Sequence, residues 1–240
     1  MAAAESTRHG GVSGPPYDSL NLGKSTNDAP DNVARNRQLF CNALGFQPDQ
    51  MAWSKQTHSD QVRVVTTPGG AEGYDALVTD RAGILLCVSV ADCTPILVFD
   101  SKTGAMAAIH AGWRGTAAGI VGKTLLRMAA EYGTRGADCY AYTGTCIGEA
   151  DFETGEEVAQ QFQEQFRRFD PVRQKYFIDL KKANETQLSG FGIPPGQMEC
   201  SPYCTVRHNS DYFSHRAEKG VTGRMLAVIG RRARAASAHD

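Results

Sequence analysis

One cysteine and two histidines stand beside segments of the chain that read as buried strands. Cys93 and His110 lie at the ends of short apolar runs rich in β-branched residues, and His58 precedes another such run. The expected strands cover residues 84–90, 96–99, 105–109 and 62–66. Side chains from separate segments can meet at strand ends, so these three residues are candidates for shared chemistry.

A thiolate and two imidazoles form a ligand set that suits zinc, and three protein ligands leave a fourth position open for water or substrate. The long spacing of His58, Cys93 and His110 is unlike that of a compact zinc finger, so the residues alone leave other chemistry open. Blue copper sites use the same ligands with a weak axial sulfur. A cysteine hydrolase would use Cys93 as nucleophile and one of the histidines as base.

His110 stands where a strand gives way to a helix. Gly-Trp-Arg-Gly follows it and leads into a helix expected over residues 116–132. Exposed backbone N–H groups at a helix start favour an anion, and the guanidinium of Arg114 could bind the same oxyanion. The alternative role for Arg114 is a surface ion pair.

Four motifs around these residues, QTHSDQV, DALVTD, ADCTPILVFD and AIHAGWRG, resemble those of the YfiH or laccase-domain family. The likeness covers almost the whole chain, through STRHGGVS, SLNLG, the pair Asn36-Arg37, DYFSHR and TGRM. The family is described as zinc-dependent purine nucleoside phosphorylases, formerly regarded as polyphenol oxidases. Several motifs in one order are a far more specific signal than any one of them.

The resemblance implies that His58, Cys93 and His110 are both metal ligands and catalytic residues, with Zn²⁺ as the cofactor. It implies phosphorolysis of adenosine, inosine and S-methyl-5'-thioadenosine, with adenosine deamination as a side activity. The partners would be a nucleoside and phosphate. Candidates for binding these substrates are residues in or beside the motifs: Arg37, Gln56, Arg114, Cys204, Arg216 and Arg224.

Polar residues near the presumed ligands are candidates for orienting them. Gln56 and Asp92 each lie within two residues of a ligand and could bond to it. Asp75 could do the same, or could form an Asx-type turn before the strand expected over residues 76–79. Cys146, in a turn bounded by glycines, is expected to line the same pocket or to pack in the interior.

A second group of cysteines and histidines lies near the end of the chain. Cys200, Cys204 and His208 follow one another at intervals of four residues, and His215 comes shortly after, so a structural zinc site is conceivable there. In the same region Ala217 stands where the family tends to carry a second arginine. This difference could weaken one anion contact.

The composition favours a small ligand. The chain has 240 residues and a formal net charge of −1, and basic residues are dispersed, so nothing indicates a nucleic-acid surface. No apolar run approaches the roughly 20 residues that span a bilayer, and the N-terminus lacks an apolar leader, so a cytoplasmic protein is expected. Seven cysteines without a disulfide-rich spacing agree with a reducing compartment. The expected state is a monomer or homodimer.

The remaining pattern predicts an α/β (α+β) protein. Helices are expected over residues 30–44, 155–169 and 179–189, with Asn27 or Asp28 near the first cap and Asp179 at the last, and strands over residues 139–143 and 225–229. Residues 1–17 are expected to be extended or loop, and the chain starts too late for a strand that the family often has before STRHGG. The resemblance implies a layered helix-sheet-sheet-helix sandwich with mixed sheets, forming one catalytic domain over residues 1–230 with a flexible tail over 231–240.

Other functions stay open at this level. A cysteine- or zinc-dependent amidase that edits peptidoglycan precursors would use the same three residues. A copper-dependent phenol oxidase would suit the laccase name, although a multicopper cluster needs many more histidines than the six in the chain. A non-catalytic binding protein stabilised by zinc is the remaining alternative.

Overall fold

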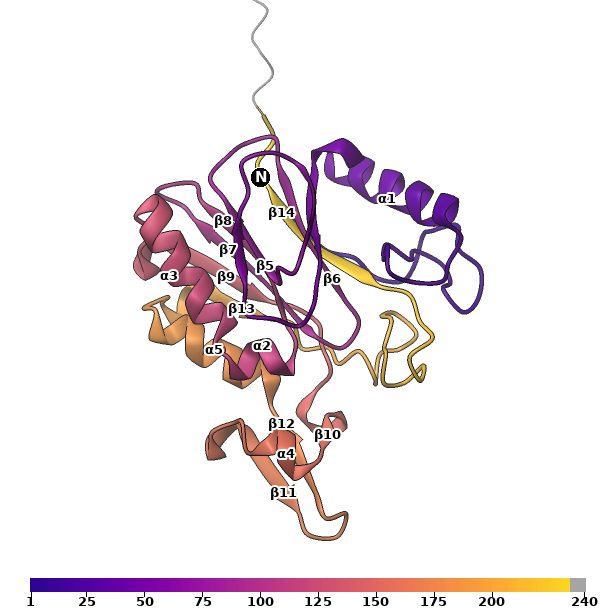
Figure 1. The fold of residues 1–240 in the computed structure, drawn as a ribbon, viewed down its shortest axis with the longest axis vertical. Coiled ribbons are helices and arrows are strands. Elements are labelled where there is room, and N and C mark those ends of the chain that lie inside the picture. Colours follow the sequence, from indigo (N-terminus) through magenta and orange to yellow (C-terminus); the bar gives the residue numbers. More distant parts are fainter. Residues whose placement is uncertain (234–240) are drawn as a thin grey trace, which may run out of the picture.

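Two mixed β-sheets pack face to face, and each carries helices on its outer side (Figure 1). The structure is a computed structural model that describes residues 1–233. The five-stranded sheet has the order β1-β14-β6-β2-β4, and the six-stranded sheet has the order β13-β9-β7-β8-β5-β3. Helix α1 covers the first sheet, and α3 and α5 cover the second. The predicted helix-sheet-sheet-helix sandwich is therefore confirmed.

The five-stranded sheet consists of β1 (Ala2–Glu5), β2 (Met51–Lys55), β4 (Gly69–Glu72), β6 (Leu85–Val90) and β14 (Met225–Gly230). The six-stranded sheet consists of β3 (Val62–Val64), β5 (Ala76–Thr79), β7 (Thr94–Asp100), β8 (Met106–Ala111), β9 (Cys139–Thr143) and β13 (Met198–Cys200). A small sheet of β10 (Glu153–Thr154), β11 (Arg167–Asp170) and β12 (Lys175–Ile178) projects from one end (Figure 1).

The helices are α1 (Pro30–Leu44), α2 (Trp113–Ala117), α3 (Ile120–Tyr132), α4 (Glu156–Ala159) and α5 (Leu180–Gly190). Single 3-10 turns occupy Pro48–Gln50, Gly136–Asp138, Glu149–Asp151, Glu164–Phe166 and Pro195–Gln197. No helix within residues 1–233 is both long and apolar enough to cross a membrane.

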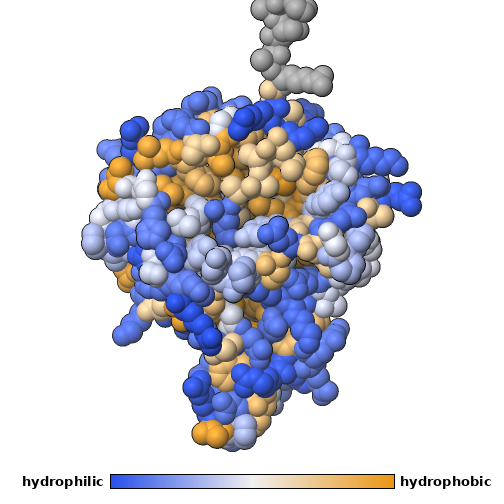
Figure 2. Space-filling view, turned by 180° about the vertical axis from the view of Figure 1, so that it is seen from behind, coloured by the Kyte–Doolittle hydropathy of each residue, from blue (hydrophilic) through white to orange (hydrophobic). Residues whose placement is uncertain are grey.

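Both faces of the central strands are buried, which explains why their sequences are continuously apolar. In β6, Leu86 and Val88 point into the layer between the sheets, whereas Leu85 and Cys87 point toward α1. Successive side chains on a strand point to opposite faces, so one run of residues supplies two cores. Apolar side chains also reach the molecular surface in the upper half of the face shown in Figure 2, whereas the projecting small sheet is mostly hydrophilic there.

Two of the expected helices have the predicted ends. Helix α1 covers residues 30–44 and stops at Gly45, whose φ of 70° suits glycine. Its N-cap is Ala29, however, and neither Asn27 nor Asp28 caps it with a side chain. Helix α5 begins after Asp179, whose carboxylate accepts a hydrogen bond from the backbone N–H of Lys182 at 2.9 Å.

Three local predictions are wrong. Residues 155–169 form only the short α4 and then turns and a strand, in which Phe162 and Phe166 pack with Ile178 of β12 and Leu180 of α5 in one buried cluster. The helix expected over 116–132 starts earlier, with α2, and breaks at Gly119, where φ is 79°. The chain does not start too late for the N-terminal strand, since β1 lies directly before STRHGG, pairs with β14 and supplies the edge strand.

The predicted tail is only partly described. Arg231 and Arg232 lie outside helices and strands but donate hydrogen bonds to the backbone oxygens of Asp80 and Leu44. Residues 234–240 lie outside the described residues.

Candidate metal centre and substrate pocket

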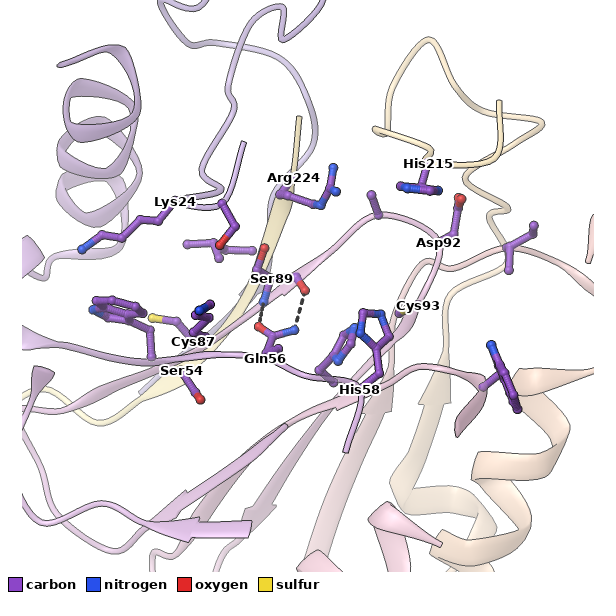
Figure 3. A pocket seen from close by; sticks show the side chains of 18 of the residues that line it. Lys24, Ser54, Gln56, His58, Cys87, Ser89, Asp92, Cys93, His215 and Arg224 are labelled. Atoms are coloured by element: carbon purple, nitrogen blue, oxygen red, sulfur yellow. Dashed lines mark hydrogen bonds between the residues drawn. The ribbon is translucent and has the colours of Figure 1, made fainter. Parts of the chain in front are cut away.

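The structure brings the three predicted ligands together. The ligand atoms of His58, Cys93 and His110 all lie within 4.8 Å of one another, and the two imidazole rings are 5.0 Å apart with their planes at 78°. His58 comes from the loop after β2, Cys93 from the turn between β6 and β7, and His110 from β8. Figure 3 shows His58 and Cys93 facing the pocket. These are the donor types that zinc and copper use, and three donors leave an open position.

Asp75 links the two histidines. Its buried carboxylate lies 2.8 Å from Nδ1 of His110 and accepts the backbone N–H groups of Thr57, His58 and Ser59 at 2.8 to 3.1 Å. A carboxylate is an acceptor, so Nδ1 of His110 carries the proton and Nε2 is left for a metal. Of the two roles considered for Asp75, the structure supports the orienting role.

Charge and hydrogen bonds within the site favour the anionic forms of Asp75 and Cys93. Burial alone would raise the pKa of Asp75, but hydrogen bonds from His110 and Ser59 hold it well below its usual range. Burial would likewise raise the pKa of Cys93, but the charge of His110 and hydrogen bonds from both histidines lower it. The thiolate is the form of cysteine that binds a metal, so this environment suits a metal ligand.

The backbone around the triad is shaped for close approach. A Cβ atom on Gly112 would lie 3.1 Å from Sγ of Cys93 and 3.0 Å from Cδ2 of His58, so a larger residue there would have to displace these two side chains. His58 and Asp92 both have left-handed backbone conformations, with φ of 59° and 81°. Non-glycine residues adopt this region only when their surroundings hold them in it, and the backbone hydrogen bonds donated to Asp75 hold the turn at His58.

The triad opens into a cavity of about 460 Å³. Two unlike groups of side chains line it on either side of the triad. In Figure 3, Lys24 and Arg224 lie toward one side of the labelled ligands, and Asp92 and His215 lie toward the other. The polar side holds Lys24 and Arg37, which both lie over the ring of Trp53, together with Arg224. The mainly aromatic side is formed by Trp113, Ile147 and Phe152, which pack in one cluster, with His215 and Arg216 beside them.

The polar side carries positive charge that no carboxylate balances. No ion pair within residues 1–233 involves Lys24, Arg37 or Arg224. Arg37 is 6% exposed and donates from Nε to the backbone oxygen of Leu22 at 2.8 Å, while Nζ of Lys24 lies 4.1 Å from the ring centre of Trp53. Burial, with the nearby charge of Arg37, lowers the pKa of Lys24. Three cations that line one cavity without a carboxylate partner favour an anionic ligand.

Lys24 was absent from the predicted site. The available signal was its position directly after the SLNLG motif, but a lone lysine in a loop carries no pattern that would single it out.

Arg114, by contrast, is not among the residues that line the cavity. Its side chain is exposed and stacks on Trp113, with Cζ 4.3 Å from the ring centre, and it forms no ion pair with a described residue. Helix α2 is only five residues long. The structure therefore places Arg114 outside the anion pocket, and it also does not form the surface ion pair considered as an alternative.

Gln56 and Asp92 lie at the site but do not orient a metal ligand as predicted. The side-chain amide of Gln56 donates to the backbone oxygen of Ser89 at 2.9 Å and accepts from its N–H at 2.8 Å (Figure 3). Gln56 therefore joins the loop that carries His58 to strand β6. Asp92 instead accepts hydrogen bonds from the segment around Ser214.

The second cysteine and histidine group does not form a metal site. Within the described part of the chain only the triad has the required geometry. Cys200 is exposed, and Cys204 is buried beside the backbone N–H of Gly148 at 3.2 Å, away from the cavity lining. Cys146 is fully buried and also absent from the lining, which agrees with a packing role.

Comparisons with known proteins agree with this architecture. Residues 2–232 match the family model described as multi-copper polyphenol oxidoreductase laccase. The chain is 41% identical to a purine nucleoside phosphorylase of Bacteroides thetaiotaomicron, over 93% of this chain and 88% of that protein. It is 36% identical to purine nucleoside phosphorylase YfiH of Escherichia coli, over 95% of this chain and 93% of that protein.

Solved structures extend the likeness to three dimensions. The crystal structure of YlmD from Geobacillus stearothermophilus has a TM-score of 0.92 and 33% identity, and the match covers 97% of this chain and 92% of that one. The crystal structure of YfiH from Bacillus licheniformis has a TM-score of 0.90 and 31% identity, and the match covers 96% of this chain and 92% of that one. The family model, the sequence relatives and the solved structures agree, and the chain belongs to the laccase-like YfiH family.

Proposed function

We propose that this protein is a purine nucleoside phosphorylase acting on adenosine, inosine and S-methyl-5'-thioadenosine. An oxygen of phosphate forms a bond to C1' of the ribose, the bond from C1' to N9 breaks, and the purine leaves with a proton. The observation that carries the proposal is a donor triad set between unbalanced cations and an aromatic wall in one cavity. The names of the relatives support the reaction class.

We propose zinc as the metal held by His58, Cys93 and His110. The donor set is that of a catalytic zinc site with an open position. When bound, zinc supplies Lewis-acid chemistry at the centre of the cavity. The family description names several coppers, but a multicopper cluster needs more histidine ligands than the two at this site, and the whole chain has six.

The polar side of the cavity would hold phosphate. Arg37 is buried, Arg224 is half-buried and Lys24 is exposed at the cavity, and together they present positive charge that a phosphate dianion can neutralise through charge-assisted hydrogen bonds. The same charges would hold phosphate next to the ribose and so reduce the entropic cost of bringing the two reactants together.

The side reaction would be deamination of adenosine. Water adds to C6 of the purine, and the amino group leaves as ammonia, so this reaction consumes no phosphate. The two activities of one cavity would therefore differ in their dependence on the polar side.

A nucleoside panel with and without phosphate, combined with metal analysis, tests the proposal. We expect about one zinc per chain, as a single triad site implies, with free purine and ribose 1-phosphate formed only when phosphate is present. Adenosine should still release ammonia without phosphate. Turnover of none of the three nucleosides by the zinc-loaded protein would overturn the proposal.

A cysteine amidase is the second candidate, because the thiol of Cys93 has a lowered pKa and lies next to two imidazoles. A metal-bound thiolate is not free to attack a substrate. If Cys93 resists iodoacetamide in the metal-loaded protein and reacts after chelation, the thiolate is a ligand. Rapid alkylation with zinc still bound would favour the amidase.

A further inference from the structure

Arg216 uses its guanidinium group to hold the backbone on both sides of Phe152. One terminal nitrogen donates to the backbone oxygen of Asp151 and the other to that of Glu153, each at 3.2 Å. The Cζ atom of Arg216 lies 5.7 Å from the ring centre of Phe152. Two donors of the arginine are thus engaged with the protein itself, and both Arg216 and Phe152 line the cavity.

Asp92 in turn holds the segment that carries Arg216. Its carboxylate accepts the backbone N–H of Arg216 at 2.6 Å and the hydroxyl groups of Ser214 at 2.7 Å and Thr205 at 2.5 Å. Asp92 directly precedes the ligand Cys93, and Figure 3 shows its carboxylate turned toward the segment of His215. A continuous set of hydrogen bonds therefore connects the turn of a metal ligand to the backbone around Phe152.

The wall that results is suited to a flat, weakly polar group. Phe152 and Trp113 pack against the buried cluster that includes Ile147, and all three line the cavity. An aromatic ring favours stacking on the π-face of a base, and it offers nothing to a phosphate oxygen. The other aromatic residue of the lining, Trp53, has the cations Lys24 and Arg37 over its ring, so the two groups of lining residues differ in the chemistry that they can bind.

We propose that Phe152 is the surface on which the purine base stacks, and that Arg216 is a positioning residue that holds Phe152 through the flanking carbonyl groups rather than a phosphate ligand. Asp92 fixes Arg216 in this arrangement. This inference rests on the proposed function for its ligand class. It assigns recognition of the base to the aromatic side of the cavity and recognition of phosphate to the polar side.

Calorimetric titration of the zinc-loaded protein tests the assignment. Inosine is titrated in phosphate-free buffer, where it can be neither phosphorolysed nor deaminated, and inorganic phosphate is titrated separately. Phe152→Leu and Arg216→Ala should each raise the dissociation constant of inosine, by roughly 5- to 150-fold for complete loss of stacking. Neither should change that of phosphate. Phe152→Tyr, which keeps the ring, should retain inosine binding.

Arg207→Ala is the matched control. Arg207 also contacts Asp151, with Nε 2.8 Å from its carboxylate, but it does not line the cavity. It should therefore bind inosine as the wild type does. Thermal melting of every variant identifies those whose fold is lost, and the milder Arg216→Gln then replaces Arg216→Ala.

The double variant that combines Phe152→Leu with Arg216→Ala tests whether Arg216 acts through Phe152. If it acts through Phe152, Arg216→Ala should add little to the loss already caused by Phe152→Leu. Additive losses, weaker phosphate binding by Arg216→Ala, or unchanged inosine binding by Phe152→Leu would each overturn the inference.

The two proposals fail in different ways. If the wild type binds inosine in a way that depends on Phe152 but carries out no phosphorolysis, only the proposed function is overturned. If the wild type carries out phosphorolysis but substitution of Phe152 does not change inosine binding, only the inference is overturned. If the wild type does not bind inosine, both are overturned.

Discussion

The carboxylate of Asp75 lies 2.8 Å from Nδ1 of His110, and the same oxygen accepts the backbone N–H of His58 at 3.1 Å. One buried side chain thus orients the imidazole of one ligand and the backbone of another. This link explains how two ligands from separate segments, one of them in a left-handed backbone conformation, can meet at one point.

Asp75→Asn should weaken zinc binding by about 10- to 100-fold, the usual effect of losing a carboxylate that orients a metal-binding histidine. The asparagine keeps the shape but lacks the negative charge that polarises the Nδ1–H bond of His110 and makes Nε2 a stronger ligand. Competition with a chromogenic chelator measures the affinity. Asp60→Asn is the control, since Asp60 pairs with Lys123 at the surface and contacts no ligand. Equal zinc affinity of wild type and Asp75→Asn would contradict this role.

Cys93→Ala should abolish turnover and zinc binding while leaving the fold largely intact. An open catalytic site contributes less to folding than a closed structural one, and the two core layers do not involve Cys93. Metal analysis and the melting curve are the two measurements. Cys200→Ala, at an exposed cysteine outside the site, should leave turnover and zinc binding nearly unchanged. Loss of zinc from the Cys200 variant would show that the wrong cysteine had been assigned.

Arg37→Ala should raise the KM for phosphate roughly 10- to 150-fold, because a hydrogen bond to a charged group contributes ~1.5 to 3 kcal/mol. Deamination of adenosine should change much less, since it does not use phosphate. Arg114→Ala should leave the KM for phosphate unchanged, because Arg114 is exposed and outside the cavity lining. A phosphate-specific defect in the Arg114 variant would instead restore the role that the sequence indicated.

Glu5 should make the protein less stable as the pH rises. Burial raises the pKa of Glu5 above its usual 4.5, so the folded state binds its proton more tightly than the unfolded state. The stabilising effect of this proton is fully present below the unfolded pKa and is lost as the pH rises through the folded pKa.

Urea unfolding between pH 4 and pH 8 tests this linkage. Glu5→Gln, which stays neutral, should gain in free energy of unfolding relative to the wild type as the pH increases. Glu199→Gln, at an exposed glutamate, should show no such trend. A difference between Glu5→Gln and wild type that does not vary with pH would refute the linkage.

The sequence by itself determined the elements whose signals are local. Apolar runs with β-branched residues identified the central strands, Gly45 marked the end of α1, and Asp179 marked the start of α5. The motifs also identified His58, Cys93 and His110 as one group. These features depend on residue type and on neighbours a few positions away, which a sequence displays directly.

Only the tertiary structure decided which polar residues serve the site. Asp75 reaches two ligands across 17 and 35 residues, Gln56 bonds Ser89 in another strand, and Arg114 turns out to the surface although it follows a ligand closely. Residues 155–169 form a short helix, turns and a strand, and Phe162 and Phe166 there pack in one buried cluster with residues of β12 and α5. Hydrogen-bond partners and burial depend on segments that are distant in the chain, and no local pattern records them.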